Sequence, residues 1–251
     1  REKPLKLETE VLWLLKSAQL LPAAIISKIN SGKNFAAKNN LTYLQTEQLM
    51  NLAMSSESIS DAITAEVPTV RAESTQFHIF RPALSGEEHY AMEIGKINRD
   101  HPILVRIHSA CFTGDVLGSL KCDCGPQLHA ATKMINDQGG GLLIYLNQEG
   151  RGIGLANKIR AYSLQDQGFD TVEANHRLGF EDDERDFQLG ATILKEMRIS
   201  NIKLITNNPS KINTMNKFDI NVTERIPLKV GQNKNNLKYI ETKAKKSGHL
   251  M

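Results

Sequence analysis

The chain has 251 residues and a mass of 28.0 kDa; 40% of the residues are apolar and 24% are charged. These values are ordinary for a globular protein, and no apolar run approaches the roughly 20 residues that span a bilayer, so a transmembrane protein and a membrane partner are excluded. The formal charge of +3 is too small to predict nucleic-acid binding. The chain starts at Arg1 without a secretory signal, and we expect a cytoplasmic protein.

Residues 1–70 differ in pattern from the rest and predict a smaller, mainly helical N-terminal segment. The apolar stretch Val11–Ile29 is expected to be largely helical, with a break at Pro22, and a second helix is expected over Thr46–Met54. No cluster of catalytic residue types occurs in this segment. Its larger apolar side chains are interpreted as a packing surface against the main domain or another subunit: Trp13, Leu14, Leu15 and Leu20.

Residues 71–251 predict an α/β (mixed α+β) domain, in which helices flank a mixed sheet. Strands are expected at Gln76–Phe80, His89–Gly95, Ile103–His108, Gly141–Leu146, Ile202–Thr206 and Ile220–Pro227. Helical spacing recurs in Leu128, Ala131 and Ile135, in Leu155, Ile159 and Tyr162, and in Phe187, Ala191 and Leu194.

The first functional signal is a cluster of cysteines. All three cysteines of the chain, Cys111, Cys122 and Cys124, lie close together, and an odd, clustered set does not form a disulfide framework. Thiolates are soft ligands for zinc, and catalytic zinc sites keep three protein ligands with one open position. The pattern favours an open catalytic zinc site; the alternatives are a structural site closed by His108 or His129, and no metal at all.

Glycines at a helix start provide a candidate anion site. A buried strand runs into residues 147–154, NQEGRGIG, and a helix is expected to follow, so backbone N–H groups gather at its N-terminus. Here Glu149 can accept hydrogen bonds from a guanine edge and Arg151 can hold a phosphate. The alternative for these two residues is a mutual surface ion pair.

Further polar residues stand near expected helix starts and strand ends. Gln127 follows Pro126 in a first helical turn, where it either contacts a polar ligand or is merely solvated. Residues 180–187 are expected to begin a helix, with Asp182 or Asp183 as the N-cap and Arg185 exposed in the first turn. The KAKK run at 243–246 is interpreted as a solvated terminal face.

Taken together, these residues resemble the GTP cyclohydrolase II family, which opens riboflavin synthesis. The resemblance runs from about residue 75 to the end of the chain. Its motifs occur in order as RIHS at 106–109, CFTGD at 111–115, CDCG at 122–125, QEGR at 148–151, NKIRAY at 157–162, LQDQG at 164–168, DERDF at 183–187 and TNNP at 206–209.

The resemblance implies a role for each matched residue. Cys111, Cys122 and Cys124 would hold one Zn²⁺ per subunit. Asp183 would be the proton acceptor, and Arg185 is the residue that the family treats as a nucleophile toward the α-phosphate. Tyr162 matches a tyrosine implicated in ring opening. Contacts with GTP are implied for Arg106, Ile107, His108, Ser109, Ala110, Gln127, Glu149, Gly150, Arg151, Thr171, Thr206 and Lys211.

The implied reaction consumes GTP and water and yields formate, pyrophosphate and 2,5-diamino-6-(5-phosphoribosylamino)pyrimidin-4(3H)-one. Cationic Arg151, Arg185 and Lys211, together with Mg²⁺, would neutralise the triphosphate. Because a guanidinium is protonated at any working pH, electrostatic stabilisation is the interpretation that we favour for Arg185 over covalent attack.

One position departs from the family pattern. Ala110 stands where the family usually carries Glu, directly before the first cysteine. A methyl group accepts no hydrogen bond, and losing one charge-assisted hydrogen bond costs about 1.5–3 kcal/mol. We therefore expect a weakened enzyme.

Residues 1–70 faintly resemble the tail of a degenerate dihydroxybutanone phosphate synthase domain, without its acidic metal cluster, and we expect no synthase activity. The resemblance and the apolar N-terminal face together favour a homodimer. Two alternatives stay open: a superfamily relative in pyrimidine catabolism, and a GTP-binding module whose turnover is impaired. A zinc module for nucleic acid is disfavoured because basic and aromatic residues do not gather around the cysteines.

Overall fold

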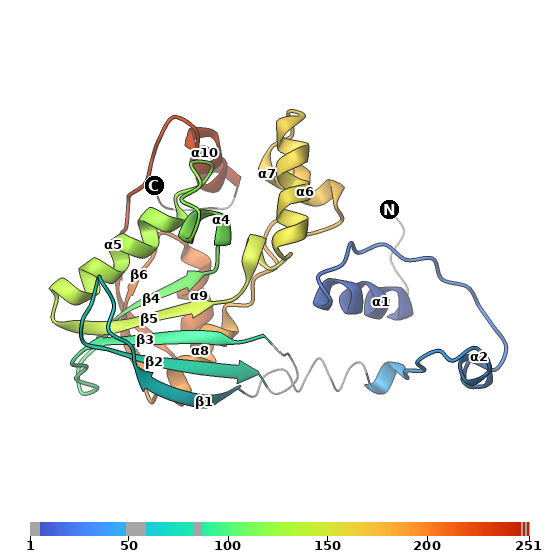
Figure 1. Ribbon diagram of the computed structural model, residues 1–251, viewed down its shortest axis with the longest axis horizontal. Helices are drawn as coiled ribbons and strands as arrows, with labels where there is room; N and C mark the ends of the chain where they lie inside the picture. The colour runs from blue at the N-terminus through green and yellow to red at the C-terminus, as the bar shows by residue number, and fades with distance from the viewer. Residues whose placement is uncertain (1–5, 49–58, 83–86, 247, 249, 251) are drawn as a thin grey trace.

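A computed structural model describes residues 6–48, 59–82, 87–246, 248 and 250 (Figure 1). Its strands are β1 (Ile59–Glu66), β2 (Thr75–Pro82), β3 (His89–Gly95), β4 (Ile103–Ser109), β5 (Gly140–Leu146), β6 (Asn201–Ile205) and β7 (Asn221–Ile226). Its helices are α1 (Lys6–Ser17), α2 (Gly32–Lys38), α4 (Phe112–Asp115), α5 (Cys124–Asp137), the short 3₁₀ helix η1 (Glu149–Arg151), α6 (Leu155–Asp166), α7 (Thr171–Arg177), α8 (Gln188–Glu196), α9 (Pro209–Lys217) and α10 (Leu237–Lys246).

The strands form one mixed sheet in the order β1-β2-β3-β5-β4-β6-β7. Strands β1, β2, β3 and β5 pair antiparallel, whereas β5, β4, β6 and β7 pair parallel. The mixed α/β fold expected from the sequence is therefore confirmed, and all six expected strands are present with ends shifted by at most a few residues.

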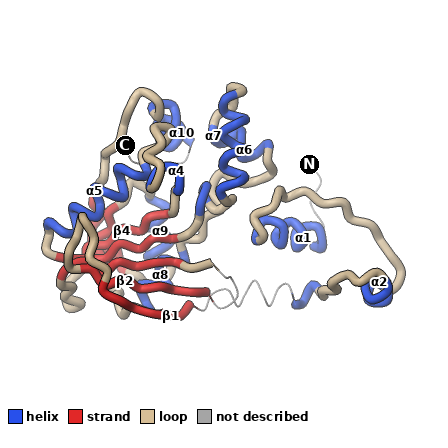
Figure 2. The backbone as a smooth tube through the Cα atoms, in the orientation of Figure 1, coloured by secondary structure: helices blue, strands red, loops and turns tan. Residues whose placement is uncertain are grey.

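Both faces of the central strands are buried, because side chains alternate between two hydrophobic clusters. On β5, Leu142, Ile144 and Leu146 pack with residues of α8 and α9, and Leu143 packs with residues of α5. Helices α8 and α9 thus cover one face of the sheet and α5 covers the other (Figures 1 and 2). The parallel strands β4, β5 and β6 end at the same edge, which places the loops that follow them together.

Strand β1 was not among the expected strands. It pairs antiparallel with β2 at the edge of the sheet, and every residue of β1 after Ile59 is exposed. The sheet therefore begins before residue 70, while the division into an N-terminal segment and a catalytic domain stays a prediction.

The N-terminal helix is shorter than expected. The prediction of helix over Val11–Ile29 is wrong beyond Ser17, because Gln19 adopts a left-handed conformation (φ 54°) and the Leu20 N–H bonds to the carbonyl of Leu15 at 2.9 Å. This closing pattern is typical of a helix C-terminus. The chain then runs as a loop to α2, a helix that the sequence pattern did not predict (Figure 2). Of the second expected helix, residues 46–48 are helical, and the rest lies outside the described residues.

The helix expected to begin within residues 180–187 starts later. It is α8, beginning at Gln188, and neither Asp182 nor Asp183 is its N-cap. The preceding residues are held in an irregular loop, since the Glu184 N–H donates to the carbonyl of Arg151 at 3.0 Å. Within the described part of the chain, none of the helices combines the length and the hydropathy that crossing a membrane requires.

Truncation of a side chain on the central strand tests the assignment of the hydrophobic core. Ile144 is fully buried on β5, so Ile144→Ala is expected to lower the free energy of unfolding by about 2–5 kcal/mol through lost burial and a residual cavity. Ile63→Ala on edge strand β1, where the side chain is 62% exposed, should change it by no more than about 0.5 kcal/mol. Urea unfolding measures both, and equal losses would contradict the assigned core.

Candidate active site

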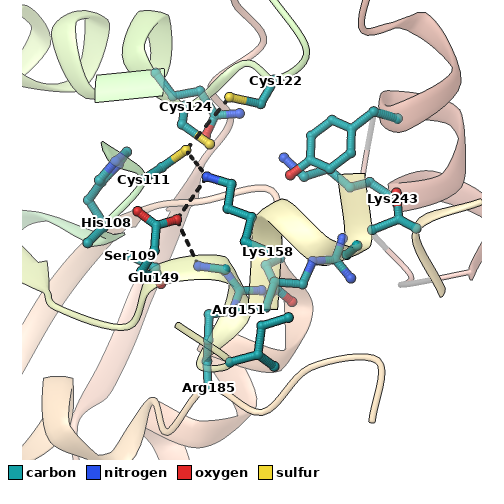
Figure 3. Close-up of a pocket in the computed structure, with 18 of the residues that line it drawn as sticks. His108, Ser109, Cys111, Cys122, Cys124, Glu149, Arg151, Lys158, Arg185 and Lys243 are labelled. Carbon is teal, nitrogen blue, oxygen red and sulfur yellow. Dashed lines mark hydrogen bonds and ion pairs between the residues drawn. The ribbon is translucent and has the colours of Figure 1, made fainter. Parts of the chain in front are cut away.

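A pocket opens at the carboxyl ends of the parallel strands. It is lined by residues that follow β4, β5 and β6, together with residues of α5, α6 and α10 (Figure 3). The topology therefore brings distant motifs of the sequence to one place.

Three thiols meet at one side of this pocket. Cys111 follows β4, whereas Cys122 and Cys124 lie at the start of α5, and the three sulfur atoms lie within 4.8 Å of one another. The Sγ atoms of Cys111 and Cys122 are 3.7 Å apart. Hydrogen bonds with Cys122 and then Cys124, aided by the nearby Lys158 ammonium, lower the pKa of the Cys111 thiol, which favours the thiolate that binds metal.

The cysteine cluster fits a zinc ion with an open position. Among the described residues, the candidate metal ligands gathered here are the three cysteines alone, without a histidine or carboxylate. His108 instead directs Nε2 to Asp115 at 3.1 Å. Glycine is required at position 114, because a Cβ there would lie 2.8 Å from the Sγ of Cys122. The backbone is thus fitted closely around the sulfur atoms.

Lys158 connects the cysteine cluster with the loop after β5. Its Nζ donates to the Sγ of Cys111 at 3.1 Å and to Oε1 of Glu149 at 2.8 Å (Figure 3). It also donates to Oγ1 of Thr113 at 2.9 Å. The side chains of Lys158 and Glu149 are only 9% and 13% exposed. Burial lowers the pKa of Lys158, but the Cys111 and Glu149 charges outweigh it and the net shift is upward, so the lysine stays cationic.

Glu149 is largely occupied by the protein itself. One carboxylate oxygen accepts the Phe112 N–H at 2.6 Å, and the other accepts Lys158 and the Gly150 N–H. A carboxylate has about four acceptor positions, which leaves about one for a ligand. The side chain therefore joins the residues that follow Cys111 to the glycine-rich loop.

The glycine-rich loop is tightly curled and includes a strained residue. Arg151 adopts φ 67°, a left-handed conformation that is unusual for a residue with a side chain. Its guanidinium donates to the carbonyl of Asp182 at 3.0 Å. Gly152 follows with φ 92°, and a Cβ there would lie 2.7 Å from the carbonyl oxygen of Glu184. Residues 149–152 are consequently fixed against residues 182–184.

Asp183 and Arg185 form a bidentate pair beside the pocket. Nε and Nη2 of Arg185 donate to the two carboxylate oxygens of Asp183 at 2.7 and 2.6 Å. Burial alone would raise the pKa of Asp183, but the bonds from Arg185 lower it. Burial lowers the pKa of Arg185, yet Asp183 raises it overall, so the pair is fully ionised. The expectation that Arg185 is exposed is wrong: its side chain is only 13% exposed.

A second polar chain runs beneath the cysteines. Arg106 donates to the Gln127 carbonyl oxygen at 2.6 Å, and the Gln127 amide donates to Asp123 at 2.6 Å. Lys243 of α10 donates to the other oxygen of Asp123 at 2.8 Å. Burial lowers the pKa of Arg106 to about 10, still well above neutrality. The expectation of a solvated terminal face is therefore wrong for Lys243, whose side chain is 12% exposed.

Most of the residues selected from the sequence share this pocket. Those lining it are Arg106, His108, Ser109, Ala110, Cys111, Cys122, Cys124, Gln127, Glu149, Gly150, Arg151, Tyr162, Thr171, Arg185, Thr206 and Lys211. Ile107 instead packs in the hydrophobic core, and its carbonyl accepts from Lys211 Nζ at 2.7 Å. Asp183 reaches the site through Arg185.

Sequence reasoning missed Lys158, Tyr239 and Lys243, all of which line the pocket. A signal for Lys158 was available, since it precedes the selected Tyr162 by one helical turn and shares its face. Tyr239 and Lys243 have the same spacing on α10. Their helix is separated from the cysteines by more than a hundred residues, so only the fold reveals this contact.

Comparisons with known proteins match the chain to one family. The family model described as GTP cyclohydrolase II matches residues 60–227. A protein of Neisseria meningitidis named GTP cyclohydrolase-2 is 53% identical over 196 residues, covering 78% of this chain and 98% of its own. A Histophilus somni protein of the same name is 54% identical over 182 residues, covering 70% of this chain and 84% of its own.

A longer relative covers the N-terminal segment as well. The riboflavin biosynthesis protein RibBA of Cytophaga hutchinsonii is 42% identical over 249 residues, which are 95% of this chain and 61% of that protein. Among solved structures, RibBX, a two-domain 3,4-dihydroxy-2-butanone 4-phosphate synthase from A. baumannii, aligns with 82% of this chain and 51% of its own, with a TM-score of 0.39 and 17% identity. That likeness is too low to inform on this chain.

A buried histidine supports the loop after β5 and makes stability depend on pH. His89 is 2% exposed, its Nδ1 accepts the Asn147 N–H at 3.0 Å, and burial lowers its pKa to about 4. The unfolded chain, with an ordinary histidine pKa near 6.5, takes up a proton first as pH falls. The stability from this group is therefore present above pH 6.5 and is lost between about pH 6.5 and 4, at up to about 1.4 kcal/mol per pH unit.

His89→Gln tests this linkage, since an amide oxygen can still accept the Asn147 N–H but does not titrate. Urea unfolding at pH 7 and pH 5 should show a loss that is about 2 kcal/mol smaller in the variant than in the parent. The same change at the exposed His101 is the control. Equal pH slopes for the parent and His89→Gln would rule out the proposed role of His89.

Proposed function

This chain belongs to the GTP cyclohydrolase II family, and we propose from its site how it hydrolyses GTP in the first step of riboflavin biosynthesis. The observation that carries the proposal is the meeting of three thiols, a carboxylate–arginine pair and several cationic side chains in one pocket. The products are formate, pyrophosphate and 2,5-diamino-6-(5-phosphoribosylamino)pyrimidin-4(3H)-one. We assign opening of the purine ring to the side of the pocket that holds the cysteines, and binding of the phosphates to the side that holds the arginines.

We propose that Cys111, Cys122 and Cys124 hold one zinc ion. Their sulfur atoms lie close enough for a shared ion, and a thiolate is favoured at Cys111. When bound, zinc lowers the pKa of a coordinated water to about 7 and so supplies a nucleophile at neutral pH for the purine C8. Lys158 stabilises the thiolate charge, and its contact with Glu149 fixes that carboxylate, whose remaining acceptor position can receive one N–H of the guanine edge.

The triphosphate is proposed to bind along the cationic side of the pocket. Arg151, Arg185 and Lys211 line it, and together with Mg²⁺ they would neutralise the phosphates and the leaving pyrophosphate. Burial, and then the charges of Arg106 and Arg185, lower the pKa of Lys211 well below its usual value, so its positive charge would depend on the bound phosphates. Arg185 acts as an electrostatic stabiliser in this scheme, because its bidentate bond to Asp183 keeps the guanidinium charged. A charged guanidinium is a poor nucleophile, so covalent attack is disfavoured.

Asp183 is proposed as the proton acceptor and Tyr162 as the proton donor. Arg185 lowers the pKa of Asp183, so the side chain is an unprotonated carboxylate that can accept a proton, although the lower pKa makes it a weaker base. Burial raises the pKa of Tyr162, so the phenol stays protonated and can donate a proton as the ring opens, although the higher pKa makes it a weaker acid. Remaining contacts with GTP are proposed for the pocket-lining residues selected from the sequence.

The assembly around this site is also part of the proposal. A homodimer is supported by the many exposed apolar side chains within residues 6–48, and a cytoplasmic location suits a biosynthetic enzyme. Residues 1–70 are proposed to be the remnant of a synthase-like domain, which is supported by the match to RibBA over 95% of this chain. Production of dihydroxybutanone phosphate from ribulose 5-phosphate would contradict the expected lack of synthase activity.

The function is tested by assaying the zinc-loaded protein with GTP and Mg²⁺ and measuring formate and pyrophosphate in the same sample. Both products are expected from the parent, and Cys122→Ser should lose zinc and release no formate, because a buried thiolate ligand is removed. Pyrophosphate without formate would place a defect at the zinc-dependent step. Neither product from a protein with zinc bound would favour the GTP-binding module or the pyrimidine-catabolism relative.

Ala110 is the observation that favours a weakened enzyme. It is 8% exposed, lines the pocket beside Cys111 and has no side-chain acceptor. Ala110→Glu is therefore expected to raise kcat/KM for GTP about ten- to hundredfold, by restoring one charge-assisted hydrogen bond. Ala110→Gln, of similar size without the charge, should gain much less. Normal parent kinetics that Ala110→Glu leaves unchanged would refute the idea.

A further inference from the structure

We propose that residues 16–22, called the arm below, position two segments that carry candidate catalytic groups, the loop of residues 179–185 and helix α6. This inference rests on the proposed function. The arm lies outside residues 60–227, which match the family model. It connects α1 with the loop toward α2, and α1 lies beside the end of the molecule that holds α6 and α7 (Figure 1). Its contacts fall on two separate segments of the site.

The first contact is an ion pair with the loop that carries Asp183 and Arg185. Lys16 Nζ lies 2.5 Å from Oε1 of Glu184, and the two side chains are 26% and 22% exposed. The same ammonium lies 5.9 Å from the ring centroid of Phe180. Oε1 of Glu184 also accepts the Glu181 N–H at 2.9 Å. Lys16 thereby fixes the Glu184 side chain, which in turn stabilises the loop of residues 181–184 by a hydrogen bond.

Glu184 transmits this contact to the pocket, because it lies between Asp183 and Arg185 in the chain. Its N–H donates to the carbonyl of Arg151 at 3.0 Å. Its own carbonyl lies so near Gly152 that a Cβ there would approach it to 2.7 Å. A shift of Glu184 therefore displaces the Asp183 and Arg185 side chains and the glycine-rich loop together.

The second contact is made at the start of α6. The carbonyl of Gln19 accepts from Nδ2 of Asn157 at 2.9 Å, and Asn157 is fully buried. Oε1 of Gln19 would lie 2.5 Å from a Cβ at Gly154. Because Asn157 directly precedes Lys158, this bond fixes the helix turn that presents the ammonium to Cys111 and Glu149.

The arm has a defined shape from its own sequence. The left-handed Gln19 closes α1 and turns the chain, so that Lys16 and Gln19 face different loops of the site. Pro22 then packs against Gly179, where a Cβ would lie 2.9 Å from its Cγ. Through these three contacts, the arm links the end of the glycine-rich loop and the start of α6 to residues 179–184.

The test reverses the charge of Lys16. Lys16→Glu is expected to lower kcat for formate release about tenfold while KM for GTP changes less than about threefold, because loop misplacement affects the reacting groups more than substrate capture. Lys16→Arg, which keeps the charge, should stay within about twofold of the parent. Lys33→Glu makes the same change at an exposed position on α2 and should leave both constants unchanged.

The double variant Lys16→Glu/Glu184→Lys should recover kcat above that of Lys16→Glu, since opposite charges again face each other. Hydrogen exchange at residues 180–187 gives a readout that needs no turnover: Lys16→Glu should accelerate it and Lys33→Glu should not. If the parent releases no formate, the proposed function fails, yet the exchange result still tests the arm. Unchanged kcat and unchanged exchange in Lys16→Glu would overturn the proposal.

Discussion

The ammonium of Lys158 is the interaction on which the candidate site depends. A buried charge is costly unless it is compensated, and this one lies between the thiol of Cys111 and the carboxylate of Glu149. Without it, the Cys111 thiolate and the Glu149 carboxylate would face each other with little solvent to separate them. Its position also explains Gly150, because a Cβ there would lie 3.0 Å from the Cβ of Lys158. One cation therefore couples the residues around Cys111 with the glycine-rich loop.

The central sheet could be predicted from the sequence because its strands are short apolar runs bounded by turns. Strand β1 could not, since only Ile59 is buried and the strand is defined by pairing with β2. The late start of α8 has a similar cause: acidic residues in 182–186 resemble a helix start, but two hydrogen bonds hold that stretch as a loop, one from Arg151 to the Asp182 carbonyl and one from the Glu184 N–H to the Arg151 carbonyl. The sequence pattern predicts a helix or strand correctly where buried side chains recur at a regular spacing. It fails where hydrogen bonds between backbone segments far apart in the chain determine the structure.

The same distinction applies to the site. Cysteine spacing and glycine-rich turns are local features, and the fold brings most residues selected from them to one pocket. The partner of Glu149 was not foreseen, because Lys158 reaches it only once α6 folds back after the glycines. The sequence pattern indicated that Lys243 is a solvated terminal residue, whereas its ammonium donates a hydrogen bond to Asp123. The residue types suited to catalysis could be selected from the sequence. The charged partners that determine their protonation could be identified only from the tertiary structure.

The left-handed backbone of Arg151 has a consequence for engineering. A residue with a side chain costs of order 1 kcal/mol or more in that region, and glycine would adopt it freely. Selection for thermostability alone would therefore replace Arg151 with glycine, as at the flanking positions 150 and 152. If Arg151 binds a phosphate of GTP as proposed, stability and substrate binding oppose each other at this position. Screens that score only folding would then favour the loss of this side chain and select robust proteins that bind GTP more weakly.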